Sequence, residues 1–141
     1  MRVIVDTNVF VSGVFFTGPP AQILEAWRGE RITVVLSAAI IEEYRRVGIE
    51  LAKRYQGADL EPLLALLLIR SELVDVPALP EPVCEDPDDD KFLACVLYSD
   101  APMVVSGDKH LLSVSRWRGV AVLSPRAFVD RFLSAGSGSR D

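Results

Sequence analysis

The sequence predicts an α/β fold in three layers, with helices on both faces of a central, mostly parallel sheet of about five strands. Short β-branched runs that are apolar at consecutive positions are typical of strands buried on both faces. Helical patterns alternate with these runs, and each connection is long enough for a right-handed crossover between parallel strands. At 141 residues, half of them apolar, the chain is expected to form one domain with its own core.

The first third of the chain is predicted to contain two strands and two helices. β-Branched runs at residues 3–5 and 32–36 indicate the strands. The first helix covers residues 9–16 with Asn8 as its cap, and the Gly-Pro-Pro run that follows breaks it. The second helix covers residues 20–29, because proline suits a first helical turn and glycine ends a helix.

Two long helices are expected in the middle of the chain. Ser37 caps the first, which runs to about Tyr55 with an apolar stripe at helical spacing. The second covers residues 59–70, and its leucines point in nearly every direction. We therefore expect this helix to be buried on more than one side. A chain this small rarely buries a peripheral helix all round, so part of this surface is expected to contact a second subunit or a partner protein.

The remaining segment is predicted to contain three strands and three helices. The alternating pattern of residues 72–76 indicates an edge strand. The other expected elements are strands 103–105 and 120–123 and helices that begin near Asp86, near Lys109 and at Ser124 or Pro125. Residues 134–141 are rich in glycine and serine and are expected to be disordered, so the domain covers residues 1–133.

The composition limits the possible functions. A formal net charge of −5 means that the protein as a whole repels polyanions, so a nucleic-acid role needs a local basic patch or bound cations. Cys84 and Cys95 lack the spacing of a metal site, and a reduced cytosolic protein is the simplest explanation. Features of a signal peptide are not seen at the N-terminus, and the longest apolar run, residues 63–69, is too short for a membrane span. We therefore expect a cytoplasmic protein without a membrane partner.

Four acidic residues are predicted to meet at one edge of the sheet. Asp6 ends the first strand, and Glu43 lies in the second turn of the helix after the second strand. Asp90 lies in the first turns of the helix before the fourth strand, and Asp108 follows that strand. The carboxyl ends of parallel strands share one edge with the amino ends of the helices after them. We expect the four carboxylates to converge there, where open α/β sheets bind ligands.

Each acid has a simpler explanation when it is considered alone. An aspartate after a strand is often a turn or cap residue, which applies to Asp6 and to Asp108. Glu43 alone is explained as a partly buried structural acid. Its neighbour Glu42 is expected to pair with the arginines of residues 45–46 at the surface.

The acidic run at residues 86–90 contains one acid that helix capping does not require. Asp86 suits the N-cap, and Asp88 and Asp89 complement the helix dipole, whereas Asp90 is predicted to lie on the inward face. Four carboxylates brought together would raise one another's pKa at a cost in stability, and a divalent cation removes that cost. Oxygen ligands without a set of histidines or cysteines favour Mg²⁺ or Mn²⁺ over zinc.

The chain contains, in order, the motifs Val5-Asp6-Thr7-Asn8, Glu43-Tyr44, Asp90-Lys91-Phe92-Leu93-Ala94 and Ser106-Gly107-Asp108. This ordered set resembles the PIN domain family over residues 2–132. It is most similar to the prokaryotic, VapC-like members that are described as toxins of toxin–antitoxin pairs. Residues 109–112 and 123–128 add to the likeness. Ser106 stands where many relatives have threonine, and His110 stands where an acid is common.

The resemblance implies a metal-dependent endoribonuclease that hydrolyses RNA phosphodiester bonds. Its catalytic and metal-binding acids would be Asp6, Glu43, Asp90 and Asp108, and its cofactor would be Mg²⁺ or Mn²⁺. The resemblance also implies RNA as the substrate, a cognate antitoxin as a partner protein and a homodimer.

Other polar residues near the acids are candidates for supporting roles. Thr7, Asn8 and Ser106 are expected to hydrogen-bond the carboxylates or a phosphate. Lys91, Lys109 and His110 are near enough in the sequence to contact RNA phosphates, and solvation at the surface is the simpler explanation of all three.

Three other classes of protein share parts of this pattern. A phosphatase of the aspartyl-phosphate type usually has a second aspartate two residues after the first, and position 8 is Asn8. A receiver-like signalling domain would have adjacent acids near the end of the first strand and an acceptor aspartate on the third, where Asp75 lies within the predicted strand. A non-catalytic binding module is the third, because ligand-binding residues can persist without activity.

Overall fold

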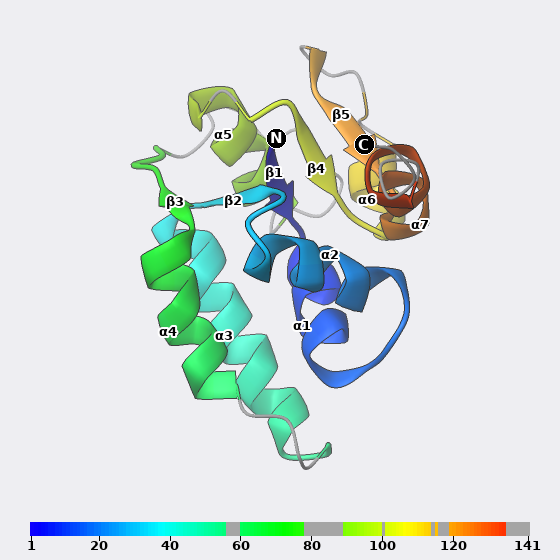
Figure 1. Ribbon diagram of the computed structural model, residues 1–141. Helices are drawn as coiled ribbons and strands as arrows, with labels where there is room; N and C mark the ends of the chain where they lie inside the picture. Colours follow the sequence, from blue (N-terminus) through cyan, green and yellow to red (C-terminus); the bar gives the residue numbers. More distant parts are fainter. Residues whose placement is uncertain (56–59, 78–88, 100, 114, 116–118, 135–141) are drawn as a thin grey trace.

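A computed structural model of the chain describes residues 1–55, 60–77, 89–99, 101–113, 115 and 119–134. Figure 1 shows an α/β arrangement in which the strands form one sheet with helices packed around it. The strands are β1 Arg2–Val5, β2 Thr33–Leu36, β3 Glu72–Leu73, β4 Met103–Val105 and β5 Ala121–Leu123. The helices are α1 Thr7–Phe15, α2 Pro19–Arg28, α3 Ala38–Ala52, α4 Leu60–Arg70, α5 Asp90–Ser99, α6 Lys109–Leu112, α7 Pro125–Phe128 and the π-helix η3 Val129–Ser134.

The sheet has the strand order β3-β2-β1-β4-β5, and every neighbouring pair is parallel. The chain builds the sheet outward from β1 to β3 and then returns to add β4 and β5 on the other side of β1. The prediction of a central, mostly parallel sheet of five strands is confirmed, as is the position of β3 at an edge. β1 therefore lies in the middle of the sheet.

The core is built around β1 and the helices nearest its end. Val3, Ile4 and Val5 are buried, because β1 has neighbours on both edges and helices on its faces. The ring of Phe10 in α1 stacks on the ring of Tyr44 in α3, with centroids 4.3 Å apart and an angle of 4° between the planes. The Tyr44 hydroxyl donates a hydrogen bond to the carbonyl oxygen of Val5. These contacts fix α1 and α3 against the carboxyl end of β1.

The chain turns from β1 directly into α1. The amide of Phe10 donates to the carbonyl oxygen of Asp6 at 3.0 Å, so Thr7 is already helical and Asp6 takes the N-cap position. The predicted cap at Asn8 is therefore wrong, because the helix begins at Thr7, two residues earlier than that cap requires. The predicted cap of α3 is confirmed, since the Ser37 hydroxyl accepts a hydrogen bond from the amide of Ile40 at 3.3 Å.

The apolar helix α4 buries only one face within the chain. Four leucines face the core, whereas Leu68 and Ile69 are 55% and 78% exposed. Within the described part of one chain, burial on more than one side, as the sequence predicted, does not occur. Leu68 and Ile69 are left as an exposed apolar surface of α4.

Several sequence predictions fall outside the described residues, among them the N-cap at Asp86, the thiol of Cys84 and the tail from residue 135 onward. Ser134 ends η3, one residue beyond the domain boundary predicted from the sequence. Cys95 is a buried core residue, and burial raises the pKa of its thiol to about 12, so the thiol stays protonated. In the part of the chain that is described, no helix has the length and apolar character needed to cross a bilayer.

Candidate active site

The strand order reverses direction between β1 and β4. The connection after β1 leads to one side of the sheet and the connection after β4 to the other, which is where open α/β sheets bind ligands. Asp6 follows β1 and Ser106 follows β4. The Ser106 hydroxyl donates to Oδ2 of Asp6 at 2.6 Å, and the Asp6 amide donates to the Val105 carbonyl oxygen at 2.9 Å. The two chain segments are thus joined at the point where a ligand is expected.

Asp108 is linked to the same hydroxyl. The amide of Asp108 donates to Oγ of Ser106 at 2.9 Å, which leaves the Ser106 proton directed at Asp6. Oδ1 of Asp108 accepts a hydrogen bond from the amide of His110 at 2.8 Å and so caps α6. Asp108 is therefore a helix cap, as the simpler explanation of this residue expected, and it also lies beside Asp6, as the prediction of converging acids expected.

Glu43 lies at the same edge of the sheet, in the second turn of α3. Its Oε1 accepts a hydrogen bond from the Thr7 hydroxyl at 2.9 Å and another from Nζ of Lys91 at 3.1 Å. Nη2 of Arg46 lies 3.8 Å from the other oxygen. The Glu43 and Lys91 side chains are 16% and 20% exposed, so this ion pair is largely shielded from water.

The arginines of α3 differ in part from the prediction. Arg46 pairs with Glu43 rather than with Glu42, and Arg45 pairs with Glu61 of α4 at 3.4 Å. These arginines therefore do not make the pairing predicted for Glu42, because Glu61 of α4 and Glu43 lie near them instead. Glu42 itself is exposed, as the sequence predicted.

The charge of Asp6 is held in an unfavourable position. The side chain is only 4% exposed, and this burial raises its pKa. The hydrogen bonds from Ser106 and from the Thr7 amide act in the opposite direction, while the charges of Asp108 and Glu43 raise the pKa further. Asp6 is thus close enough to Asp108 and Glu43 for their charges to disfavour its ionised form, which is a situation that a bound cation relieves.

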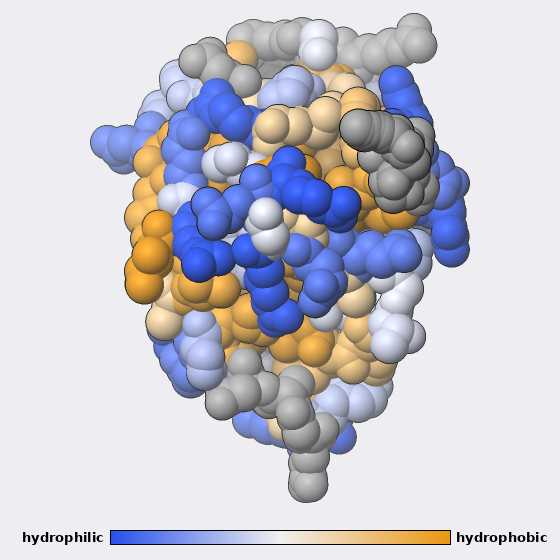
Figure 2. Space-filling view, in the orientation of Figure 1, coloured by the Kyte–Doolittle hydropathy of each residue, from blue (hydrophilic) through white to orange (hydrophobic). Residues whose placement is uncertain are grey.

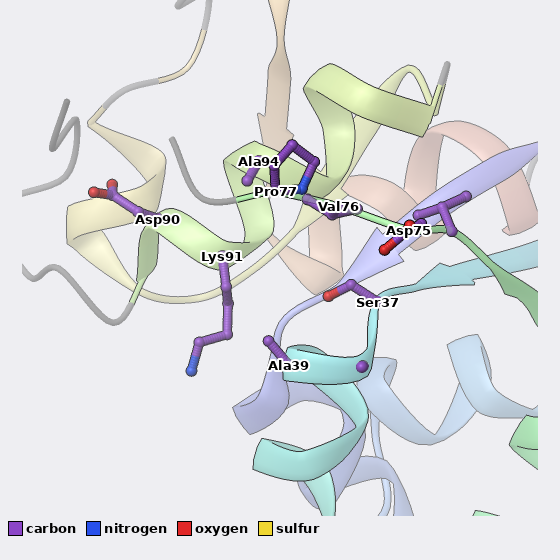
Figure 3. Close-up of a pocket in the computed structure, with 10 residues that line it drawn as sticks. Ser37, Ala39, Asp75, Val76, Pro77, Asp90, Lys91 and Ala94 are labelled. Atoms are coloured by element: carbon purple, nitrogen blue, oxygen red, sulfur yellow. The ribbon is translucent and has the colours of Figure 1, made fainter. Parts of the chain in front are cut away.

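Asp90 and its neighbour Asp89 differ in burial. Asp90 begins α5, is half-buried, and lines a pocket with Ser37 and Lys91. In Figure 3 the Asp90 carboxylate and the Lys91 ammonium group point in different directions from the start of this helix. Asp89 is only 7% exposed, which is unusual for an aspartate. The sequence pattern explained Asp89 by the helix dipole alone, so its burial makes it a candidate that sequence reasoning missed.

The remaining predicted residues also differ in their surroundings. Thr7 and Ser106 are buried and contact the acids as described, whereas Asn8 is exposed. Lys109 is exposed and His110 is half-buried. The contact between Lys91 and Glu43 had no signal in the sequence beyond the presence of a lysine next to Asp90.

The donor set suits a hard divalent cation. Asp6, Glu43 and Asp108 supply carboxylate oxygens at this edge of the sheet, and oxygen ligands are those preferred by Mg²⁺ and Mn²⁺. Among the residues that are described, no three acidic, histidine or cysteine side chains surround a single point as ligands would. Each of these carboxylates accepts at least one hydrogen bond from the chain itself. The oxygen chemistry of the residues fits a hard divalent metal.

Comparison with known proteins gives three findings. A family profile described as PIN domain matches residues 2–110. An uncharacterized protein of Methanocaldococcus jannaschii is 33% identical over 118 residues, which cover 81% of this chain and 75% of that protein. Among solved structures, this chain is similar to a chain of VapBC2 from Rickettsia felis, with a TM-score of 0.57 and 13% identity. That crystal structure shows VapBC2 bound to a DNA fragment from the VapBC2 promoter. That similarity covers 88% of this chain and 98% of the other, and it shows a shared fold.

Proposed function

This chain belongs to the PIN domain family, and we propose that it is a metal-dependent endoribonuclease that acts as the toxin of a toxin–antitoxin pair. The observation that carries the proposal is the buried carboxylate of Asp6 after β1, which is oriented by Ser106 and repelled by Asp108 and Glu43. A buried acid in such surroundings costs stability, and groups of this kind are concentrated at functional sites. Binding a cation that activates water for phosphodiester hydrolysis is the function that this group of oxygens suits.

Asp6, Glu43, Asp90 and Asp108 would hold the Mg²⁺ or Mn²⁺ ion. When bound, such an ion lowers the pKa of a water molecule and stabilises charge on a phosphate. The net charge of −5 makes a cation at this site more necessary, because the protein as a whole repels RNA.

The residues around these acids would keep the carboxylates in place. Ser106 directs its proton at Asp6 because its oxygen is already held by the Asp108 amide. Thr7 and Lys91 both contact Oε1 of Glu43, which limits the rotation of that carboxylate. The Lys91 ammonium group also provides a positive charge beside Glu43, where a phosphate of the RNA backbone would bind.

The proposal is tested by incubating the purified protein with a labelled RNA in Mn²⁺, in Mg²⁺ and in EDTA. We expect internal cleavage with either metal, loss of cleavage in EDTA and recovery when excess Mn²⁺ is added. Glu43→Gln should lower the rate by about 10- to 100-fold or more, the range found for residues that orient or bind a metal. Glu42→Gln is the matched control and should cleave at the wild-type rate, because Glu42 is exposed beside it.

Two outcomes would contradict the proposal. Cleavage that continues unchanged in EDTA would show that the acids do not act through a metal. A protein that cuts no RNA with any divalent metal but binds a partner protein tightly would instead be a non-catalytic binding module. If the protein is a cytoplasmic toxin, we expect it both to cleave RNA and to bind a cognate antitoxin.

The exposed apolar surface of α4 supports the proposal of protein partners. Figure 2 shows hydrophobic surface over this helix, where Leu68 and Ile69 are exposed. A groove of about 610 Å³ continues from Leu68 to Ile41 and Val74 beside it. Exposed apolar surface of this kind usually marks a protein interface. A homodimer and an antitoxin complex are the two assemblies that we propose for this chain.

The homodimer is tested by measuring the mass of the purified protein by light scattering during gel filtration. We expect twice the mass of one chain for the wild type and a shift toward the monomer for Ile69→Glu, because a charge would be buried in the interface. Tyr98→Ser, which changes an exposed apolar residue on α5, is the control and should leave the mass unchanged. A wild-type protein that stays monomeric at about 100 µM would leave the α4 surface to the antitoxin alone.

A further inference from the structure

A pocket of about 380 Å³ lies at the same edge of the sheet as the acidic residues, beside the end of β2. Three segments form it: the beginning of α3, the residues that follow β3 and the beginning of α5 (Figure 3). Its volume lies within the range of small-molecule sites, about 300–1,000 Å³. The pocket is therefore large enough to enclose a chemical group of the substrate.

Lys91 connects this pocket to the candidate active site. The Lys91 side chain is part of the pocket wall, and its Nζ lies 3.1 Å from Oε1 of Glu43. The same oxygen of Glu43 accepts a hydrogen bond from Thr7, which follows Asp6 directly. A group in the pocket would thus be separated from Glu43 by the Lys91 side chain. This arrangement suits a substrate that places one chemical group in the pocket while its phosphate is bound at the acidic residues.

The pocket walls select the chemistry of the bound group. Most of the lining is apolar and comes from small side chains, such as Ala39, Ala94 and Val76, which favours a partly apolar group. The acidic residues Asp75 and Asp90 also line it, and in Figure 3 they lie at opposite sides, with the Asp90 carboxylate pointing away from the other labelled side chains. Carboxylates accept hydrogen bonds and repel anions, so the pocket is unsuited to a phosphate itself.

We propose that this pocket binds an amino-bearing nucleobase of single-stranded RNA, next to the phosphate that is cleaved. Asp75 accepts a hydrogen bond from the exocyclic amino group of adenine, cytosine or guanine, as acidic side chains do from cytosine. Uracil has a single N–H between two carbonyl oxygens, and these oxygens would face the carboxylate. Lys91 disfavours the other occupant that an acidic pocket would suit, a basic side chain of a partner protein. The inference rests on the proposed ribonuclease function.

The proposal is tested by titrating metal-free protein in EDTA with each of the four nucleoside 5′-monophosphates and recording amide chemical shifts by NMR. We expect AMP, CMP and GMP to shift the amides of Ala39, Asp75 and Ala94, with UMP binding about tenfold more weakly, since uracil has no exocyclic amino group to donate to Asp75. Asp75→Asn should bring the four affinities to within about twofold, because an amide both donates and accepts. Asp130→Asn, an exposed acid on η3, is the matched control and should keep the preference.

Several results would overturn the proposal. Equal binding of UMP and CMP, or no shift of the pocket amides at millimolar nucleotide, would show that the pocket does not bind an amino-bearing nucleobase. Shifts of those amides by an arginine-containing peptide and by no nucleotide would assign the pocket to a partner protein. RNA cleavage in Mn²⁺, measured on the same protein preparation without EDTA, separates this inference from the proposed ribonuclease function. Cleavage without nucleotide selectivity would leave the ribonuclease standing without this pocket, and selective nucleotide binding without cleavage would leave the pocket without the ribonuclease.

Discussion

Asp6→Asn is expected to lower metal-dependent RNA cleavage by at least about 100-fold, since even residues that only contact metal ligands contribute about 10- to 100-fold. The reason is the central position of Asp6, between Ser106 and the repelling charges of Asp108 and Glu43. An asparagine keeps the size of the side chain and can still accept the Ser106 proton through its amide oxygen. The substitution therefore removes the charge and little else.

The same substitution is expected to raise the stability of the metal-free protein at pH 7. Burial raises the pKa of Asp6 in the folded state, so its ionised form is less favourable there than in the unfolded chain. This destabilising contribution of ionised Asp6 has its full size at pH values above the folded pKa, and it becomes smaller as the pH falls through that value. It disappears below the unfolded pKa, which is near the ordinary value of 3.8. The melting temperatures of the wild type and Asp6→Asn should therefore differ at pH 7 and converge in acid.

Thermal melts with and without metal give a readout that does not depend on cleavage. Mn²⁺ should raise the melting temperature of the wild type, by an amount that corresponds to about 2.7 kcal/mol at 100 times its Kd, and should leave Asp6→Asn nearly unchanged. Asp130→Asn, at an exposed position, serves as the control and should respond to Mn²⁺ as the wild type does. A variant that still cuts RNA at the wild-type rate would exclude Asp6 from the reaction.

Tyr44→Ala is expected to lower the free energy of unfolding by about 3–5 kcal/mol, the range found when a large buried aromatic is truncated. Tyr44 is fully buried, stacks on Phe10 and donates to the Val5 carbonyl oxygen, so its removal leaves a cavity between α1, α3 and β1. Urea unfolding followed by circular dichroism would measure the loss, and the melting temperature should fall by roughly 10 °C or more.

Tyr44→Phe separates the ring from the hydroxyl. We expect it to cost only about 1–2 kcal/mol, because the stacked ring remains and the carbonyl oxygen of Val5 alone loses its donor. Equal losses for the two variants would mean that the hydroxyl, and not the packing of the ring, holds α3 against β1. Tyr55→Phe, at an exposed position near the end of α3, is the control and should unfold at the same urea concentration as the wild type.

The fold could be predicted from the sequence because its strands are short, β-branched and separated by long crossovers. Val3 to Val5 and Met103 to Val105 are apolar at every position, which indicates strands buried on both faces, as the strands of parallel sheets are. Helix ends were less certain. The start of α1 depends on a backbone hydrogen bond at Asp6 that no side-chain pattern reveals.

The candidate site could be predicted in part. Asp6 and Ser106 follow adjacent strands, so strand order alone brings them together. Which of the aspartates before α5 faces the site depends on how the first turn of that helix begins, and capping rules cannot decide it. The pairing of Lys91 with Glu43 depends on the distance between the beginnings of two helices 48 residues apart in the chain. That distance is a result of packing, and the pattern of one sequence does not contain it.

The hydrogen bond between Ser106 and Asp6 joins residues that are 100 positions apart. During synthesis the first strand leaves the ribosome long before the fourth, and β1 has no partner on its β4 side in the meantime. Asp6 cannot be oriented until the chain beyond Asp108 has emerged. Any activity that requires Asp6 to be held by Ser106 therefore requires the chain to be made through β4.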